Sequence, residues 1–334
     1  MLTTTAAGRT WNFSHAIGRN AAAGAGFTQP TAVAVAPDGI LYVLSRGQEG
    51  VGAVVADNKR IGKVSMDQEF ISDFGRREFV WPAGLAVSDD GDLYCSDEFG
   101  HYVASYNPDG ERLGQWGEHG TEEGQLNGPS GIAFDADDNL YVVDHRNHRV
   151  QRFTKDGEYI SGFGEEGASE GQLHLPWGIT LGGDGDLCVA DWRNDRIQKF
   201  TSDGEFVSSF GESGEGDGQF NRPNGIAVDS DGDIYVCDWM NDRVQVFDQS
   251  GSYKDVLIGH SGMSKWGRTF LDANPDIESK LELAAQNIEL KQRFYRPVSV
   301  HVDEDGKVYV ADCYRHRVQI YQKLSASPDL GISA

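Results

Sequence analysis

The sequence predicts an all-β fold, a six-bladed β-propeller of four-stranded blades. Three observations predict it. A proline recurs at nearly constant spacing, each proline opens a unit of short β-rich runs, and glycine is abundant, with 42 of the 334 residues. Units of about 40–50 residues with four strands each are typical of propeller blades, and abundant glycine fits the many tight turns that such blades need.

The repeated unit begins at a proline, and the successive spacings are 52, 47, 47, 47 and 74 residues for Pro30, Pro82, Pro129, Pro176, Pro223 and Pro297. In the fifth unit, the apolar run Gly225–Asp229 is followed by an Asp-Gly turn and by the strands Ile234–Val236 and Arg243–Phe247. Alternating apolar residues predict strands, and the Asp-Gly pair supplies the positive φ that a two-residue hairpin turn demands. Six prolines therefore predict six blades.

Closure of the ring is predicted from the two ends of the sequence. The last unit ends with its third strand, Arg317–Tyr321, and lacks a clear fourth, whereas residues 10–18 match the fourth-strand pattern that precedes a proline. We therefore expect residues 10–18 to complete the sixth blade and to remove an exposed sheet edge. The domain would span residues 1–323, followed by a tail at 324–334.

Two units depart from the repeat. The first is longer by five residues within 46–58, and the last spacing exceeds the others by 27 residues, which predicts an insertion at 255–295 between blades five and six. Asn274 as a cap, Pro275 at the first helical position and apolar residues at helical spacing predict a helix there. A lid or partner-binding element and a tolerated surface insertion both remain open.

The repeats resemble the NHL family. The resemblance is strongest at Gly218–Asp229 and Asp238–Phe247, and it extends over almost the whole chain. It implies a six-bladed propeller. NHL repeats occur in RNA-binding propellers, protein-interaction modules and peptidylglycine amidating lyases, so the fold alone does not choose a function.

Composition disfavours several classes of partner. Lys and Arg total 29 against 52 Asp and Glu, a formal charge of −23, which opposes nucleic acid and anionic membranes. Mean hydropathy is −0.47, and we see neither a transmembrane run nor a signal peptide, so we expect a cytoplasmic protein. A removed leader would leave the same sequence. The four cysteines form no CxxC pair, and we expect no cofactor.

Two sets of loops should meet at one mouth of the central channel. Their positions are the residue after each proline and the residue after each strand-ending Asp, or Ser45 in the first unit. The first set is Thr31, Ala83, Ser130, Trp177, Asn224 and Val298; the second is Arg46, Glu98, His145, Trp192, Trp239 and Cys313. Positions that vary between blades while staying polar or aromatic are site candidates.

These loops suggest a mixed site. Arginines could bind a carboxylate, Glu98 and His145 could move protons, and an aromatic wall with Asn224 could contact a ligand. The arginines are Arg46, Arg222 and Arg296, and the wall would be Trp177, Trp192, Trp239 and Tyr314. The alternative is that the tryptophans merely seal the channel mouth and that His145 is solvated.

Other recurring residues have structural explanations. We expect the strand-ending aspartates to accept backbone N–H groups of the following turn, with Asn and Arg neighbours completing an inter-blade network. The sequence Asp229-x-Asp231-Gly-Asp233 superficially resembles a calcium loop, but its turn role suffices. His148 and His316 look like surface turn residues, Cys313 like a small buried hydrophobe, and His301 stands where other blades have Ala or Thr.

The resemblance also bears on metal chemistry. Zinc-binding histidines of the amidating lyases follow the repeat proline, and none of the six corresponding positions here holds His. We therefore expect no zinc site there. The predicted function is binding of a small molecule or protein at the channel face. The alternative is a metal-independent lyase or hydrolase on the same face, and whether the protein is an enzyme stays open.

Overall fold

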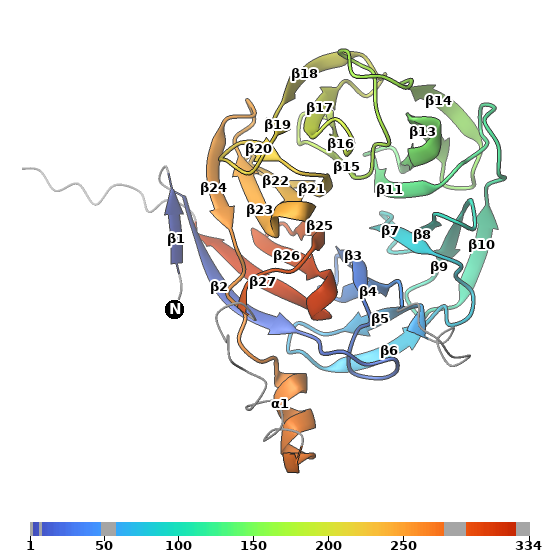
Figure 1. Cartoon of the computed structure of the whole chain (residues 1–334). Helices are drawn as coiled ribbons and strands as arrows, with labels where there is room; N and C mark the ends of the chain where they lie inside the picture. Colours follow the sequence, from blue (N-terminus) through green and yellow to red (C-terminus); the bar gives the residue numbers. More distant parts are fainter. Residues whose placement is uncertain (1–2, 7–8, 48–57, 277–291, 325–334) are drawn as a thin grey trace, which may run out of the picture.

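Six antiparallel blades form a ring in the computed structural model, which describes residues 3–6, 9–47, 58–276 and 292–324 (Figure 1). Blades one to three are β3 (Pro30–Val35), β4 (Leu41–Ser45), β5 (Arg60–Val64), β6 (Phe70–Phe74); β7 (Pro82–Val87), β8 (Leu93–Asp97), β9 (Tyr102–Tyr106), β10 (Arg112–Trp116); and β11 (Pro129–Phe134), β12 (Asn139–Asp144), β13 (Arg149–Thr154), β14 (Tyr159–Phe163). The predicted propeller is confirmed.

Blades four to six continue the ring. Their strands are β15 (Ile179–Leu181), β16 (Leu187–Asp191), β17 (Arg196–Phe200), β18 (Phe206–Phe210); β21 (Pro223–Val228), β22 (Ile234–Asp238), β23 (Arg243–Phe247), β24 (Tyr253–Leu257); and β25 (Pro297–Val302), β26 (Lys307–Asp312), β27 (Arg317–Leu324) with β2 (Arg9–Ile17). A short parallel pair, β19 (Glu212–Ser213) and β20 (Gln219–Phe220), lies in the connection from blade four to blade five.

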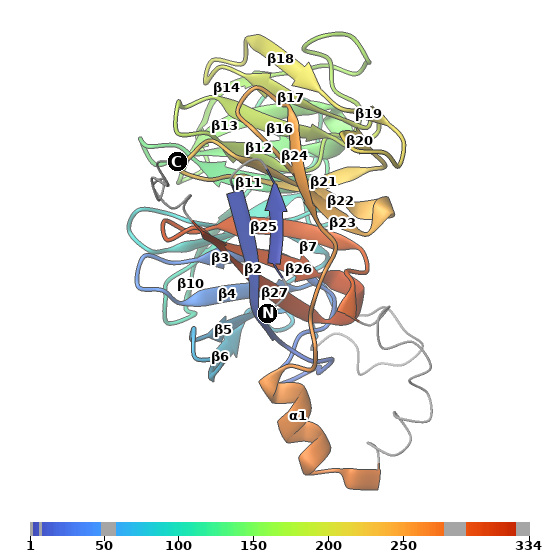
Figure 2. The same cartoon turned by 90° about the vertical axis from the view of Figure 1, so that its left-hand side faces the viewer.

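The N-terminal strand closes the ring as predicted. β2 pairs antiparallel with β27, and β1 (Thr3–Ala6) adds a fifth strand that the sequence analysis did not foresee (Figure 2). Trp11 of β2 is fully buried, and its indole N–H donates to the Tyr235 hydroxyl of blade five at 3.0 Å. The closing strand therefore bonds to the neighbouring blade as well as to its own.

The strand-ending aspartates of blades two to six hold each of these blades to the connection before it. Asp144 is fully buried; its Oδ1 accepts the Asn127 N–H at 2.6 Å, and its Oδ2 accepts from Asn147 and from Arg149 at 2.8 Å. Arg149 also donates to the Gln125 carbonyl of the same connection, so the inter-blade network is present. The expected acceptance from the following turn is confirmed for Asp97, which accepts the Gly100 N–H at 2.8 Å, but is wrong for Asp144, whose backbone donor lies 17 residues upstream.

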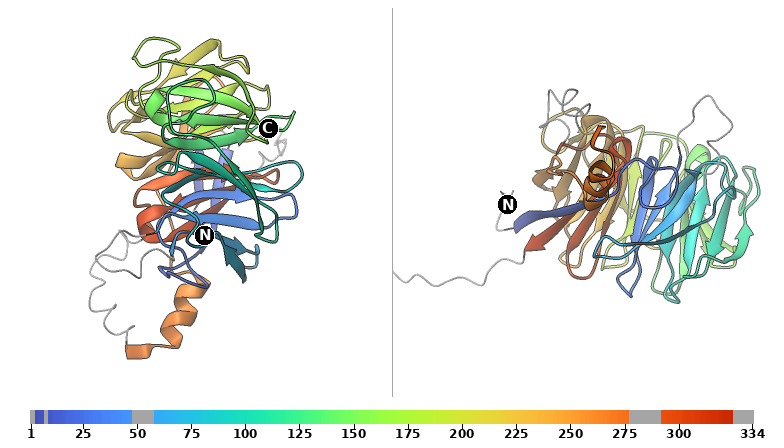
Figure 3. Two further views of the ribbon diagram at one scale, coloured as in Figure 1. Left: turned by 90° about the vertical axis from the view of Figure 1, so that its right-hand side faces the viewer. Right: turned by 90° about the horizontal axis from the view of Figure 1, so that it is seen from below.

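The insertion between blades five and six contains α1 (Lys265–Asp272), which begins at a Ser264 cap and was not predicted. The predicted helix start is also present, since Pro275 and Asp276 are helical. Trp266 of α1 packs against Phe27 and Phe70 at ring distances of 5.6 and 6.4 Å and donates to the Gln68 carbonyl. α1 therefore lies against the outer side of blades six and one, and Figure 3 shows it projecting from the ring. The predicted helical positions 277–288 lie outside the described residues.

His148 and His316 bond neighbouring blades, and their interpretation as surface turn residues was incomplete. The Nδ1 of His148 accepts the Leu175 N–H, and that of His316 accepts the Gln29 N–H, both at 3.1 Å. Asp242 accepts the Arg296 N–H in the same way at 2.8 Å. The three donor residues, Leu175, Gln29 and Arg296, each precede a repeat proline and have positive φ values between 50° and 59°. The bond therefore holds a left-handed backbone in place.

These junctions predict a dependence of stability on pH. Burial lowers the pKa of His316, so the unfolded chain takes up the proton first and stability falls as the pH drops below about 6.5. Protonated His316 cannot accept the Gln29 N–H. His316→Asp should therefore reduce the stability lost between pH 7 and 5 by about 1 kcal/mol, and Asp242→His should increase it. Urea unfolding at both pH values measures this, and parallel pH curves for all three proteins would contradict it.

Candidate functional site

The predicted site residues gather at one mouth of the channel. Each first strand begins, and each second strand ends, on the same face of the ring, which we call the Pro–Asp face. The innermost strands of all six blades line a cavity of about 360 Å³, and Thr31, Trp177 and Asn224 are among its lining residues. Candidate residues from blades one, four and five therefore share one cavity.

Two polar side chains lack hydrogen-bond partners at the Pro–Asp end of this cavity, which we call the throat. Thr31 Oγ1 and Asn224 Oδ1 have no hydrogen bond within the described part of the chain, although the two residues are only 6% and 7% exposed. Ser130, at the matching position of blade three, is satisfied because it donates to the Trp177 carbonyl at 2.9 Å. A buried polar group without a partner is costly, so these two groups favour a bound molecule that completes their bonds.

The predicted aromatic wall forms on the Pro–Asp face. The His145 ring lies edge-on to Trp177 at 4.8 Å and 6.3 Å from Trp192. Trp192 lies 6.4 Å from Trp239. Tyr314, 47% exposed, instead packs on Tyr295 at 5.4 Å in blade six. The wall is thus continuous from Trp177 to Trp239, and Tyr314 belongs to a separate aromatic pair.

The predicted arginines stack on these rings. The guanidinium of Arg46 lies over Trp81 at 5.1 Å and Trp177 at 5.8 Å, that of Arg222 over Trp192 at 4.5 Å, and that of Arg296 over Trp239 at 5.3 Å. Burial lowers the pKa of Arg46, and the nearby Glu98 charge opposes this. Trp81 was missed by the sequence analysis, although it precedes a repeat proline just as Arg222 and Arg296 do.

The two candidate proton carriers have different surroundings. His145, 7% exposed, has Nδ1 2.9 Å from the Pro176 carbonyl oxygen, so Nδ1 carries the proton and Nε2 keeps its lone pair. Burial lowers the pKa of His145 to about 4, and the ring is neutral at pH 7. Burial raises the pKa of Glu98, which pairs with Arg146 at 2.9 Å. Arg146 is a further residue that the sequence analysis did not single out.

Comparison with known proteins agrees with this architecture. The sequence model of the NHL repeat matches residues 126–153, 173–200, 220–247 and 294–321. This chain carries NHL repeats. The four matched segments lie in blades three to six, and the first two blades of the NHL propeller keep the same strand order without a match. No curated protein sequence matches the chain.

Solved structures share the fold of the NHL propeller. A protein of unknown function from Bacteroides thetaiotaomicron has a TM-score of 0.68 at 19% identity, covering 95% of this chain and 76% of that one. Virginiamycin B lyase from Staphylococcus aureus, solved with quinupristin, has 0.58 at 15%, covering 93% and 99%. An auxiliary nutrient binding protein from Bacteroides ovatus has 0.62 at 13%, covering 94% and 77%. At these identities the likeness shows the fold alone.

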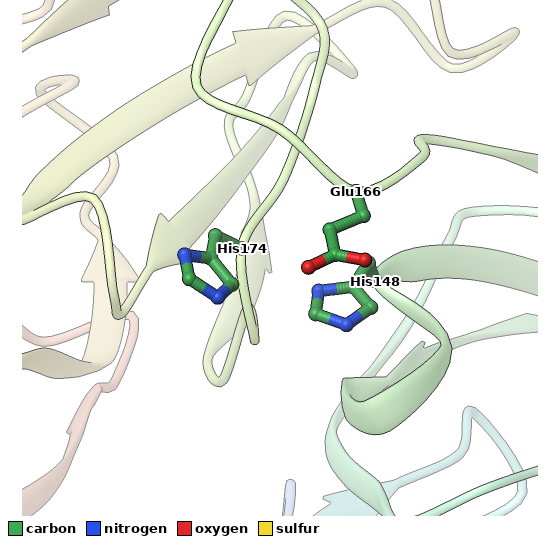
Figure 4. Close-up of side chains that lie close together, drawn as sticks. All are labelled: His148, Glu166 and His174. Atoms are coloured by element: carbon green, nitrogen blue, oxygen red, sulfur yellow. The ribbon is translucent and has the colours of Figure 1, made fainter.

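Among the described residues, a cluster of potential metal ligands lies at the junction of blades three and four. Atoms of His148, Glu166 and His174 lie within 4.8 Å of one another (Figure 4). His148 Nδ1 already accepts the Leu175 N–H, so a neutral ring carries its proton on Nε2 and has no lone pair left for a metal. Only Glu166 and His174 remain as free donors, fewer than the three or four that zinc needs.

Two further residues of the NHL propeller were singled out by the sequence. Cys313 is buried, and burial raises the pKa of its thiol to about 12, so it is a small buried hydrophobe as expected and no thiolate nucleophile. His301 lines the channel cavity among alanines of other blades, and burial lowers its pKa to about 4. In the described residues, no helix has the length and apolar character needed to cross a membrane.

Proposed function

We propose that this protein binds a small molecule at the Pro–Asp mouth of its channel. The observation that carries the proposal is the pair of unpartnered groups, Thr31 Oγ1 and Asn224 Oδ1, in a throat beside an aromatic wall. Aromatic side chains together with a few converging polar groups are the usual composition of a small-molecule site. A cavity of about 360 Å³ suits a small ligand better than a folded protein, the other partner considered.

A lyase or hydrolase that needs no metal is the second candidate function, and one observation favours it. His145 presents a neutral ring whose Nδ1 proton is held by a backbone carbonyl, the arrangement in which Nε2 can accept a proton from a substrate. Arg46 flanks the same Trp177 ring and could stabilise a developing negative charge. His145→Asn would abolish turnover while leaving ligand affinity nearly unchanged if this second function is correct.

Binding is tested through the aromatic wall. Trp192→Ala and Trp239→Ala should each weaken ligand binding by about 1–3 kcal/mol without unfolding the ring, because each removes a large, partly exposed contact surface. A metabolite library screened by thermal shift supplies the ligand, and tryptophan fluorescence titration measures its affinity for each variant. Met240→Ala is the matched control, since Met240 follows Trp239 in the same turn and is 39% exposed.

If the tryptophans only pack, the same variants would lose stability and keep their affinity. Both quantities are therefore measured on each protein. Loss of melting temperature with unchanged affinity would contradict the proposal.

A further inference from the structure

We propose that the ligand of the channel mouth is a small monocarboxylic acid that also carries a hydroxyl or amide group, and that Arg46 binds its carboxylate. This inference rests on the proposed function, because it names the ligand class of the same site. It is drawn from the side-chain groups of the throat that lack hydrogen-bond partners and from the charges around Arg46.

Arg46 has a guanidinium with most of its donors unused. Its Nε donates to the Pro82 carbonyl at 3.3 Å, and within the described residues its two terminal nitrogens make no hydrogen bond or ion pair. The negative charge of Glu98 counteracts the lowering of the Arg46 pKa by burial, but the Glu98 carboxylate is already hydrogen-bonded to Arg146. The Trp81 and Trp177 rings flank the guanidinium. An arginine fork with two free nitrogens matches the two oxygens of a carboxylate.

The charge balance favours a single negative charge on the ligand. The carboxylates of Glu98 and of the buried Asp97 already act on the Arg46 charge, and Glu98 is also paired with Arg146, so the site has room for little further negative charge. On the outer rim, a guanidinium nitrogen of Arg296 lies 3.8 Å from a carboxylate oxygen of Asp242 and forms an ion pair with it. Because one guanidinium is unpaired at this depth, a carboxylate fits better than a phosphate, which carries more than one charge near neutral pH.

The unpartnered side-chain groups of the throat indicate a second polar group on the ligand. Thr31 adjoins Arg46 in blade one, because the preceding residues Pro30 and Ser45 pair between β3 and β4. Asn224 comes from blade five, and its unpartnered Oδ1 requires a donor. A ligand carboxylate on Arg46 and Thr31, with a hydroxyl or amide N–H reaching Asn224, would complete these bonds. The apolar remainder would contact Trp177 and the small residues of the channel.

The test uses the full chain with 3-phenyllactate, its neutral analogue 3-phenyllactamide, and 2-phenylethyl phosphate, each followed by tryptophan fluorescence and melting temperature. We expect the acid to bind wild type about tenfold more tightly than the amide. Arg46→Met should remove this preference, whereas Asn224→Leu should weaken acid and amide alike and keep it. Arg193→Met is the control, since Arg193 is exposed on the same face over Trp192.

Each outcome decides the proposal. Equal binding of acid and amide to wild type, or a preference that survives in Arg46→Met, overturns the carboxylate assignment while the binding function stands. Tighter binding of the phosphate also overturns it. If none of the three compounds shifts melting or fluorescence, the carboxylate assignment fails, whereas the proposed function fails only if the metabolite screen also finds no ligand. Arg46→Lys, which keeps the charge without the fork, gives an intermediate preference and serves if Arg46→Met does not fold.

Discussion

Deleting residues 1–18 is expected to lower the free energy of unfolding by several kcal/mol. The deletion removes β2, exposes the edge of β27 and takes away the fully buried side chain of Trp11. Trp11→Ala alone should cost about 3–5 kcal/mol, because it leaves a cavity and also removes the donor to Tyr235. Urea unfolding followed by circular dichroism measures both changes.

A matched control is Ser14→Ala, since Ser14 is an exposed position of the same strand. It should leave the unfolding midpoint nearly unchanged. A deletion variant that melts and stays in solution like the full chain would refute closure by the N-terminal strand.

Lys323→Met is expected to destabilise the protein by about 3–5 kcal/mol and to make its stability depend on calcium. The Lys323 ammonium lies 2.6 to 2.8 Å from carboxylate oxygens of Asp229, Asp231 and Asp233, with its side chain 7% exposed. Burial lowers the pKa of Lys323, but its bonds to these carboxylates outweigh burial and raise it overall. Without the ammonium, the carboxylates, two of them buried, lack a cation.

Calcium prefers carboxylate oxygens, so millimolar CaCl₂ should restore part of the melting temperature of Lys323→Met and leave that of wild type unchanged. Melting curves with CaCl₂ and with EDTA measure this. Lys307→Met is the comparison variant, because Lys307 contacts Asp303 and Asp305 with a side chain that is 35% exposed and should cost far less. Equal losses in the two variants would show that the caged position of Lys323 has no special effect.

The two largest expected effects belong to one network. Trp11 of the closing strand donates to Tyr235, whose hydroxyl donates to Asp229 at 2.8 Å, and Asp229 accepts from Lys323. Closing strand, blade five and blade six are thereby joined by buried polar bonds. The combined variant Trp11→Phe with Lys323→Met should therefore cost a different amount from the sum of the single changes, because both act on this network.

The sequence analysis predicted blade number, closure and the residues of the channel mouth because those features follow from local periodicity. The recurring proline, spaced by 47 residues in three of five intervals, and the strand-ending Asp of five blades specify where a blade begins and turns. Positions that repeat from blade to blade then lie on the same face of the ring. For this reason Arg46, Glu98, His145 and Trp177 could be placed together without a structure, although their binding role stays a prediction.

Other features depend on which residues of different repeats meet in space. The Asp229–Asp233 turn looked self-sufficient, and only the pairing of β2 with β27 and the packing of blade six on blade five show that Lys323 fills it. The path of the insertion placed α1 against the outer side of blades six and one, where Trp266 packs on Phe27. Repetition within the chain determined the ring and the channel mouth, because the strands of each blade follow from the same local sequence pattern. Tertiary structure alone decided the partners of Lys323 and Arg46, because each contacts residues that no repeat period brings near it.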